Sequence, residues 1–390
     1  MENKFNICII GAGIAGLAIA ESLSRLFENI IVIDKERTFG QHISSRNSEV
    51  IHSGFYYPKN SLKSKLCISG NDMLYQFAKK YHIKHKKCGK LIVINKKEDE
   101  SKLISISKHA IDCGLAGLKI LDKDEAKSIE PKVNCYKALY IPSTGIIDSH
   151  GVMSKLESIS KLQDVDFLYK TDVTSIELKD NLYRIYINGS KECIISDVVI
   201  NTAGLWSDAI SKMVGIDSYE IEYYKGDYFK SQSIKNLNCL IYPLPKMSSL
   251  GIHTVLSLNG DVSFGPNLYK VNKIDYSIDD RFKERYIQEI SNHGSWKLIS
   301  SGTIPPDPTR ILSSRKMHEF VQILREDDTF DIIGLKEFSP GKTLILKANH
   351  NDGTCYYSHD CDTAEVDEEY RFANHFDITT SEFSAELSVF

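Results

Sequence analysis

FNICIIGAGIAG, residues 5–16, is the stretch of sequence that decides the fold. The apolar run Phe5 to Ile10 predicts a strand buried on both faces, and it stops at a glycine-rich turn. A helix is expected over Ile14 to Phe27, because the apolar residues there recur at helical spacing. A second apolar run, Ile30 to Ile33, ends at Asp34. The first ~35 residues therefore predict a β-α-β unit.

Three glycines in this unit match the dinucleotide-binding fingerprint. Gly11 permits a tight turn, Gly13 lets the backbone approach a pyrophosphate, and Gly16 lets the helix pack closely on the strand. The N–H groups at the helix start can bind phosphates. Asp34 ends the second strand, where a carboxylate can accept hydrogen bonds from ribose hydroxyls. FAD and NAD share the adenosine diphosphate group, so the fingerprint leaves both open.

Composition narrows the class of protein. The chain has 390 residues, 42% of them hydrophobic, which is enough for a large core and favours two lobes. A net charge of -4 gives no basic excess, so we expect small-molecule partners and no nucleic acid. Nine cysteines are scattered without a CxxC pair or zinc-type spacing. We therefore expect reduced thiols and no metal site.

The termini and apolar runs bear on localisation. Met1 to Lys4 lead directly into the first strand, so we expect no targeting peptide. No apolar run approaches the ~20 residues of a membrane span. The sequence thus favours the cytoplasm, and peripheral membrane contact through a surface helix stays compatible with it.

The rest of the chain changes in texture along its length. Helices are expected at Leu62–Tyr81 and Leu103–Cys113 and a strand at Lys90–Ile94, all assigned to the first lobe. Asn188-Gly189 predicts a hairpin between Tyr183–Ile187 and Cys193–Ile195. Further strands are expected at Asp197–Ile200, Ile221–Phe229, Leu240–Tyr242, Gly251–Leu256 and Asp261–Phe264.

The segment Ser44 to Pro58 combines small polar residues, an arginine, a histidine and paired tyrosines in one loop. With this loop the chain resembles the L-2-hydroxyglutarate dehydrogenase/oxidase family, in the wider group of D-amino-acid oxidase and glycerol-3-phosphate dehydrogenase flavoproteins. The resemblance continues, in the family's order, through blocks at 61–63, 87–93, 141–148, 201–208, 225–229, 241–243, 251–253 and 264–267. It implies FAD, bound covalently or noncovalently, and an α/β, two-lobed fold with a Rossmann-like FAD-binding lobe and a β-rich substrate lobe.

The resemblance also divides the chain into segments. Residues 1–80 hold the βαβ unit and flavin loop, 81–150 are mixed and partly cap, and 151–215 continue the FAD-binding lobe. Residues 216–295 form the β-rich substrate lobe, and 296–348 return to the FAD lobe with a divergent sequence. Residues 349–390 are an acidic tail that we expect to be loosely ordered.

Carried over by position, the resemblance implies a set of cofactor-binding residues. Gly11, Ala12, Gly13, Ile14, Ala15 and Gly16 would hold the pyrophosphate, and Asp34 and Lys35 the ribose and adenine. Ser45, Asn47 and Ser48 would pass along the flavin, Val173 would meet the adenine through its backbone, and Ala203 and Gly204 would approach the cofactor closely. Gly341 lies in a possible counterpart of the family's Ser-Pro-Gly block.

Oxidation of a 2-hydroxy acid needs a base for the hydroxyl proton and cations for the carboxylates. His253 is the first choice for the base and His52 the second, although either can be a structural histidine. Arg46 can pair with a substrate carboxylate, or form a surface salt bridge. Trp206 is expected to serve in packing.

The final quarter departs from the family. Ser301–Pro306 stands where the family has Gly-x-Arg-Pro, but Pro305 replaces the arginine, with Arg310 and Arg315 downstream. The leading hypothesis is FAD-dependent oxidation of L-2-hydroxyglutarate, with oxygen or a quinone as electron acceptor. The rivals are a related enzyme acting on an amino acid or glycerol 3-phosphate, and a flavin-binding or flavin-free remnant without catalysis.

Overall fold

The computed structural model describes residues 4–191, 193–245 and 252–277, together with four short strands further along the chain. The helices of this part are α1 (Ile14–Leu23), α2 (Leu62–Lys80), α3 (Glu100–Asp112), α4 (Lys123–Ile129), α5 (Ser149–Leu162) and α6 (Ser207–Met213), with 3-10 turns at Ile43–Ser45, Lys97–Asp99 and Gly204–Trp206.

The strands of the first half are β1 (Lys4–Ile10), β2 (Ile30–Ile33), β3 (Val50–Ile51), β4 (His85–Lys86), β5 (Lys90–Ile94), β6 (Lys119–Asp122), β7 (Lys137–Ile141), β8 (Gly145–Ile147), β9 (Asp166–Leu168) and β10 (Val173–Lys179). Those of the second half are β11 (Leu182–Ile187), β12 (Cys193–Asn201), β13 (Tyr223–Lys235), β14 (Leu240–Pro243), β15 (His253–Leu256), β16 (Asp261–Val271), β17 (Pro306–Ser313), β18 (Thr329–Asp331), β19 (Lys347–Asn349) and β20 (Phe372–Asn374).

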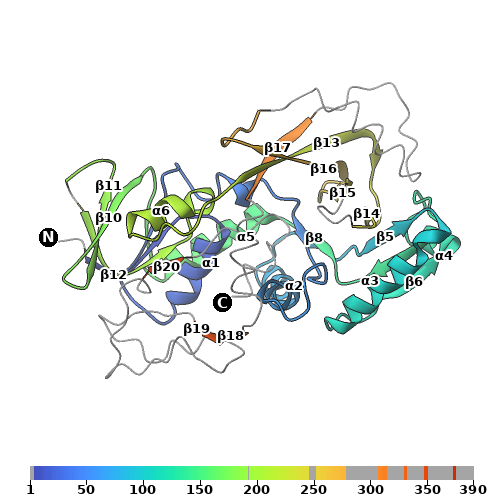
Figure 1. The fold of residues 1–390 in the computed structure, drawn as a ribbon, viewed down its shortest axis with the longest axis horizontal. Helices are drawn as coiled ribbons and strands as arrows, with labels where there is room; N and C mark the ends of the chain where they lie inside the picture. The colour runs from blue at the N-terminus through green and yellow to red at the C-terminus, as the bar shows by residue number, and fades with distance from the viewer. Residues whose placement is uncertain are drawn as a thin grey trace.

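A seven-stranded sheet forms the first lobe (Figure 1). Its order is β10-β11-β12-β1-β2-β9, and β20 pairs with β12. β1 is parallel to both β2 and β12, and β2 is parallel to β9, whereas the β10-β11-β12 edge is antiparallel. The predicted β-α-β unit is thus confirmed, with β1 at the centre of the sheet.

Helices cover both faces of this sheet, which explains why β1 has no polar alternation. Ile7 and Ile9 pack on one side in a core that includes residues of α1, α2 and α5. Cys8 and Ile10 point to the other side, into a core shared with α6 and the β10-β11 hairpin. Cys8 is fully buried there, and burial raises the pKa of its thiol far above the usual range. It is therefore a small hydrophobic residue of the core.

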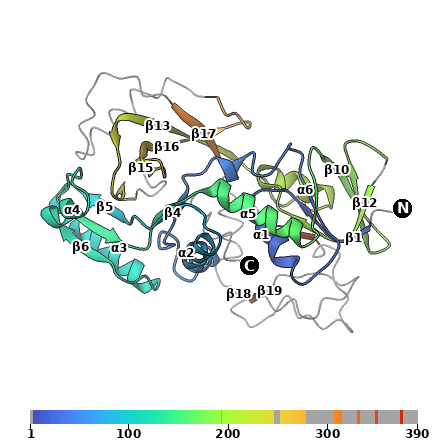
Figure 2. The same ribbon diagram turned by 180° about the vertical axis from the view of Figure 1, so that it is seen from behind.

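A second lobe contains two four-stranded sheets, ordered β15-β16-β13-β17 and β14-β5-β7-β6. Both sheets contribute to one apolar core, in which Phe229 and Phe264 meet residues such as Leu91 and Leu139. β5 pairs in parallel with β14, and α3 packs in the same core. The two views place α3, α4, β5 and β6 at the far end of the molecule from β1 (Figures 1 and 2).

The interpretation that assigned Lys90–Ile94 and Leu103–Cys113 to the first lobe is therefore wrong. Local periodicity identified the strand and the helix correctly, as β5 and α3. Their lobe depends on the pairing of β5 with β14, which lies ~150 residues later and leaves no local signal.

Several boundaries also differ from expectation. α1 ends at Leu23, short of Phe27, and Leu26 is exposed. The runs at Cys193–Ile195 and Asp197–Ile200 form a single strand, β12, because Ser196 is buried within it and donates a hydrogen bond to the Val198 carbonyl. Part of the expected loose tail is a strand, since Phe372–Asn374 pairs with β12. None of the described helices is long and apolar enough to cross a membrane.

Candidate active site

The first cavity lies at the carboxyl ends of β1, β2 and β12 and measures about 270 Å³. The crevice beyond the carboxyl ends of parallel strands is where open α/β sheets bind ligands. Seven residues expected at the cofactor line it: Gly11, Gly13, Asp34, Lys35, Val173, Ala203 and Gly204. They come from four separate segments, which the sheet brings together.

The glycine-rich turn has the geometry that the fingerprint requires. Gly11 adopts a φ of 112°, which L side chains rarely adopt. A Cβ on Gly16 would stand 1.9 Å from the Gly11 carbonyl oxygen, so only glycine allows α1 to start this close to the turn. Gly13 caps α1 without a side-chain hydrogen bond, and the backbone N–H of Ile14 donates to Ser44 Oγ at 3.0 Å.

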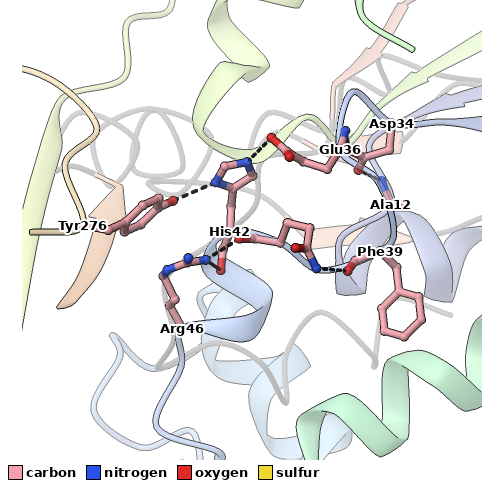
Figure 3. A network of polar contacts seen from close by, with 8 residues as sticks. Ala12, Asp34, Glu36, Phe39, His42, Arg46 and Tyr276 are labelled. Carbon is pink, nitrogen blue, oxygen red and sulfur yellow. Dashed lines mark hydrogen bonds and ion pairs between the residues drawn. The ribbon is translucent and has the colours of Figure 1, made fainter. Parts of the chain in front are cut away.

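Asp34 holds this turn against the end of β2 (Figure 3). Its Oδ2 accepts a hydrogen bond from the Ala12 N–H at 2.6 Å, and its Oδ1 accepts from the Glu36 N–H at 2.8 Å. Burial raises the pKa of Asp34, while these two hydrogen bonds act in the opposite direction. The lone pairs left on the carboxylate are available for ligand hydroxyls at the cavity wall.

A polar network that the sequence did not suggest lies beside Asp34 (Figure 3). His42 Nε2 lies 2.8 Å from Glu36 Oε1, and its Nδ1 lies 2.8 Å from the Tyr276 hydroxyl. The His42 ring also contacts the edge of Trp206, with ring centroids 4.6 Å apart. Burial lowers the pKa of His42, and the hydrogen bond to Glu36 opposes this. Tyr276 therefore joins the segment after β16 to the loop of the first lobe.

Trp206 lines the same cavity, and the Lys35 ammonium lies 3.0 Å from the centroid of its ring. Trp206 therefore forms part of the cavity wall, in addition to the packing role expected for it. Ala12, Ile14, Ala15 and Gly16 are buried or backbone-bonded behind this wall and support the turn from inside.

A second cavity, of about 300 Å³, separates the loop Ser45 to Glu49 from strands β15 and β16. Ser45, Asn47 and Ser48 line it. Asn47 fixes the loop, because its Nδ2 donates to the Ser44 carbonyl at 2.6 Å and its Oδ1 accepts from the Glu49 N–H at 2.8 Å. Ser45 Oγ is buried and, within the described part of the chain, without a hydrogen-bond partner.

Arg46 also borders the second cavity, but its guanidinium is already engaged. It donates to the carbonyl oxygens of Gln41 and His42 and lies 3.8 Å from the Tyr276 ring centroid (Figure 3). Both hydrogen bonds come from Nη1, so they fix the orientation of the guanidinium beside the cavity without using its Nε and Nη2 donors.

His52 and His253, far apart in the sequence, approach one another in the interior. His253, on β15, is 6% exposed and stacks on Tyr242, with ring centroids 3.9 Å apart. Burial lowers the pKa of His52 well below its ordinary value, and the neighbouring charges of Lys90, His253 and Lys63 lower it further. His52 is therefore a neutral imidazole at physiological pH, the form that accepts a proton.

Some expectations cannot be compared with the structure. Gly341, Pro305 and Arg315 lie outside the described residues. Arg310 belongs to β17, which pairs with β13 in the second lobe.

Comparison with known proteins identifies the family. The model of the family described as FAD dependent oxidoreductase matches residues 6–295. The chain belongs to this family. The oxidoreductase therefore uses FAD, and the first cavity suits the adenosine diphosphate half of that cofactor through its close-approach glycines, its helix start and the Asp34 carboxylate.

Individual relatives carry a more specific name. L-2-hydroxyglutarate dehydrogenase of Arabidopsis thaliana, named mitochondrial, is 31% identical over 88% of this chain and 82% of its own length. The enzyme of that name from Indibacter alkaliphilus is 32% identical over 70% of this chain and 72% of its own length. The human one is 33% identical over 76% and 68%.

Solved structures support the fold. An L-alpha-glycerophosphate oxidase from Mycoplasma pneumoniae with FAD bound gives a TM-score of 0.72 at 23% identity, over 81% of this chain and 85% of that one. A glycine oxidase from Geobacillus kaustophilus gives 0.70 at 14% identity, over 99% and 92%.

Proposed function

We propose that this protein oxidises L-2-hydroxyglutarate, or a close 2-hydroxy dicarboxylic acid, to the 2-oxo acid. The observation that carries the proposal is the convergence of His52 and His253 with lysines in one buried cluster of basic side chains. Proton acceptors and cations are what a 2-hydroxy acid needs at its hydroxyl and carboxylates. The names of the relatives favour the same substrate.

Bound FAD would supply the hydride acceptor for C2 of the substrate, and the task left to this chain's residues would be to accept the hydroxyl proton as the C2–O bond becomes a carbonyl. We propose His253 as that base and His52 as the second candidate. His52 is held neutral by burial, and its position is fixed because its carbonyl accepts a hydrogen bond from Asn71 Nδ2 at 2.9 Å.

We further propose that the walls of the first cavity bind the nucleotide end of FAD, and that Ser45, Asn47 and Ser48 border the flavin. The two cavities share the loop that runs from Gly40 to Glu49, so one cofactor can extend from one to the other. Oxygen or a quinone is the proposed electron acceptor. The cytoplasm is the proposed compartment, with peripheral membrane association as the alternative.

Anaerobic reduction of the purified holoenzyme tests the substrate. We expect L-2-hydroxyglutarate to bleach the flavin absorbance, and its D-enantiomer, glycerol 3-phosphate and amino acids to leave it unchanged. Bleaching by an amino acid alone would refute the substrate, and a protein purified without flavin that also fails to bind added FAD would favour a non-catalytic remnant.

His253→Ala tests the base. We expect flavin reduction to slow by about 100-fold or more while FAD stays bound. His150→Ala, on the exposed face at the start of α5, is the matched control and should leave reduction unchanged. If His253→Ala reduces at the normal rate, His52→Ala becomes the decisive variant.

A further inference from the structure

Lys90, the first residue of β5, lies with its side chain wholly inside the second lobe, 0% exposed. Its Nζ is 4.4 Å from the ring centroid of Tyr56, 4.7 Å from that of Tyr242 and 5.1 Å from that of Phe55. Of the residues that the structure describes, none accepts a hydrogen bond from this ammonium. The Lys90 ammonium is thus surrounded by three aromatic rings.

These rings compensate the buried charge only in part. A cation–π contact stabilises an ammonium ion by less than taking that ion out of water costs. Burial accordingly lowers the pKa of Lys90 to about 7, and the one neighbouring group that raises it is Cys67. Buried charges in proteins are normally paired, so an anionic partner is missing from the described part of this cluster.

Two neighbours of Lys90 also have a buried polar atom without a partner in the described part of the chain. His52 Nε2 and the Tyr56 hydroxyl are both buried and lack a hydrogen-bond partner among the described residues. The groups that act electrostatically on His52 are Lys90, His253 and Lys63, which are all basic. An anion with several acceptor oxygens would satisfy the ammonium and the hydroxyl together, and a carboxylate has this character.

We propose that Lys90 binds the distal carboxylate of the substrate and thereby selects dicarboxylic over monocarboxylic 2-hydroxy acids. The inference rests on the proposed function and names a specificity-determining residue for it. Tyr242 lies against both Lys90 and His253, so the ammonium is displaced by an aromatic ring from the proposed base. The α-carboxylate is bonded to C2, the carbon whose hydroxyl gives its proton to the base. The distal carboxylate of a five-carbon diacid lies further from the base.

The position of Arg46 supports this assignment. Its guanidinium is fixed beside the second cavity, because Nη1 donates to two backbone carbonyls and the Tyr276 ring lies against it. The Lys90 ammonium has no such hydrogen bonds to lose in the described structure.

The test uses glutarate and pentanoate, which have five carbons, carry no hydroxyl to be oxidised and differ only in the distal carboxylate. Binding to the holoenzyme is followed by the change in flavin absorbance. We expect Lys90→Met to lower the affinity for glutarate by about 100-fold, because truncating one partner of a buried charge pair changes affinity by this much. Pentanoate affinity should change by less than about threefold. Lys90→Arg should recover part of the glutarate affinity.

Lys225→Met is the matched control, since Lys225 is also buried but pairs with Asp275 at 3.3 Å. It should leave the preference for glutarate over pentanoate unchanged. Flavin content and melting temperature report whether each variant is folded, and Lys90→Gln takes over if Lys90→Met is not.

Unchanged glutarate binding in a folded Lys90 variant overturns the inference, and so does an equal loss for glutarate and pentanoate. The two proposals fail separately. If L-2-hydroxyglutarate reduces the wild-type flavin but Lys90 variants keep the glutarate preference, only the role of Lys90 is wrong. If glutarate binds through Lys90 but L-2-hydroxyglutarate does not reduce the flavin, only the proposed substrate is wrong.

Discussion

Asp34→Asn should weaken FAD binding, because both carboxylate oxygens of Asp34 accept backbone hydrogen bonds. Oδ2 accepts from Ala12 at 2.6 Å and Oδ1 from Glu36 at 2.8 Å. An amide keeps one acceptor and turns its NH₂ toward the other N–H group. Hydrogen bonds to a charged group contribute about 1.5 to 3 kcal/mol, so losing one corresponds to about 10- to 150-fold in an equilibrium constant.

The glycine-rich turn is the element that this loss would affect, since Ala12 lies between Gly11 and Gly13 at the cavity. We therefore expect the FAD dissociation constant of the apoprotein, measured by quenching of flavin fluorescence, to rise at least about tenfold. Asp166→Asn removes the same charge from an exposed residue at the start of β9, away from the cavity lining, and should have little effect. Equal dissociation constants for wild type and Asp34→Asn would refute the assigned role of the carboxylate.

Two further outcomes follow from the same geometry. Gly16→Ala places a Cβ 1.9 Å from the Gly11 carbonyl oxygen, so α1 must shift. We expect the free energy of unfolding in urea to fall by about 1–3 kcal/mol and flavin to be lost on purification. A variant with a full complement of flavin and wild-type stability would contradict this. Because Lys90 has a pKa of about 7 and must be protonated to bind an anion, glutarate affinity should be nearly constant between about pH 6 and 7, where glutarate is a dianion, and fall by up to about tenfold per pH unit above pH 7. Lys90→Met should abolish this dependence even though the other titratable groups around the site remain: His52, Tyr56, Lys63, Cys67, Tyr242 and His253.

The glycine-rich turn at the first cavity was predictable because its signals are local. The apolar run of β1, the glycines and Asp34 lie within ~35 residues, and each glycine has a steric reason at its own position. Val173, Ala203 and Gly204 were assigned by resemblance, and all three line the cavity. Their proximity to Gly11 follows from the parallel pairing of β1 with β12.

The contacts that the sequence did not reveal join residues far apart in the chain. His42 and Tyr276 are 234 positions apart, and neither has a local pattern that distinguishes it from a surface residue. The sequence marks Lys90 as the start of a predicted strand and as part of a block of the family resemblance, with no indication of a buried position. Its place beside Tyr242 depends on the parallel pairing of β5 with β14, which a periodicity argument cannot supply.

One loop connects the two candidate binding regions, and its rigidity decides how they act together. Its first part, up to Glu49, lines both cavities. Its second part carries His52 and Tyr56, which lie in the surroundings of Lys90. The second part is fixed because Ser53 Oγ lies 2.7 Å from Thr144 Oγ1. Asn71 Nδ2 further bridges the carbonyls of His52 and Ser143.

These hydrogen bonds join the loop to α2, which packs in the core of the first lobe, and to the turn between β7 and β8, so they connect His52 to both lobes. Hydride transfer requires the reacting atoms to be held at about 3 to 3.5 Å, and a loop bonded on both sides can maintain such a distance. In the sequence, the polar side chains of this segment indicated only a family resemblance. In the structure, they form the hydrogen bonds that set the spacing between the first cavity and the surroundings of Lys90.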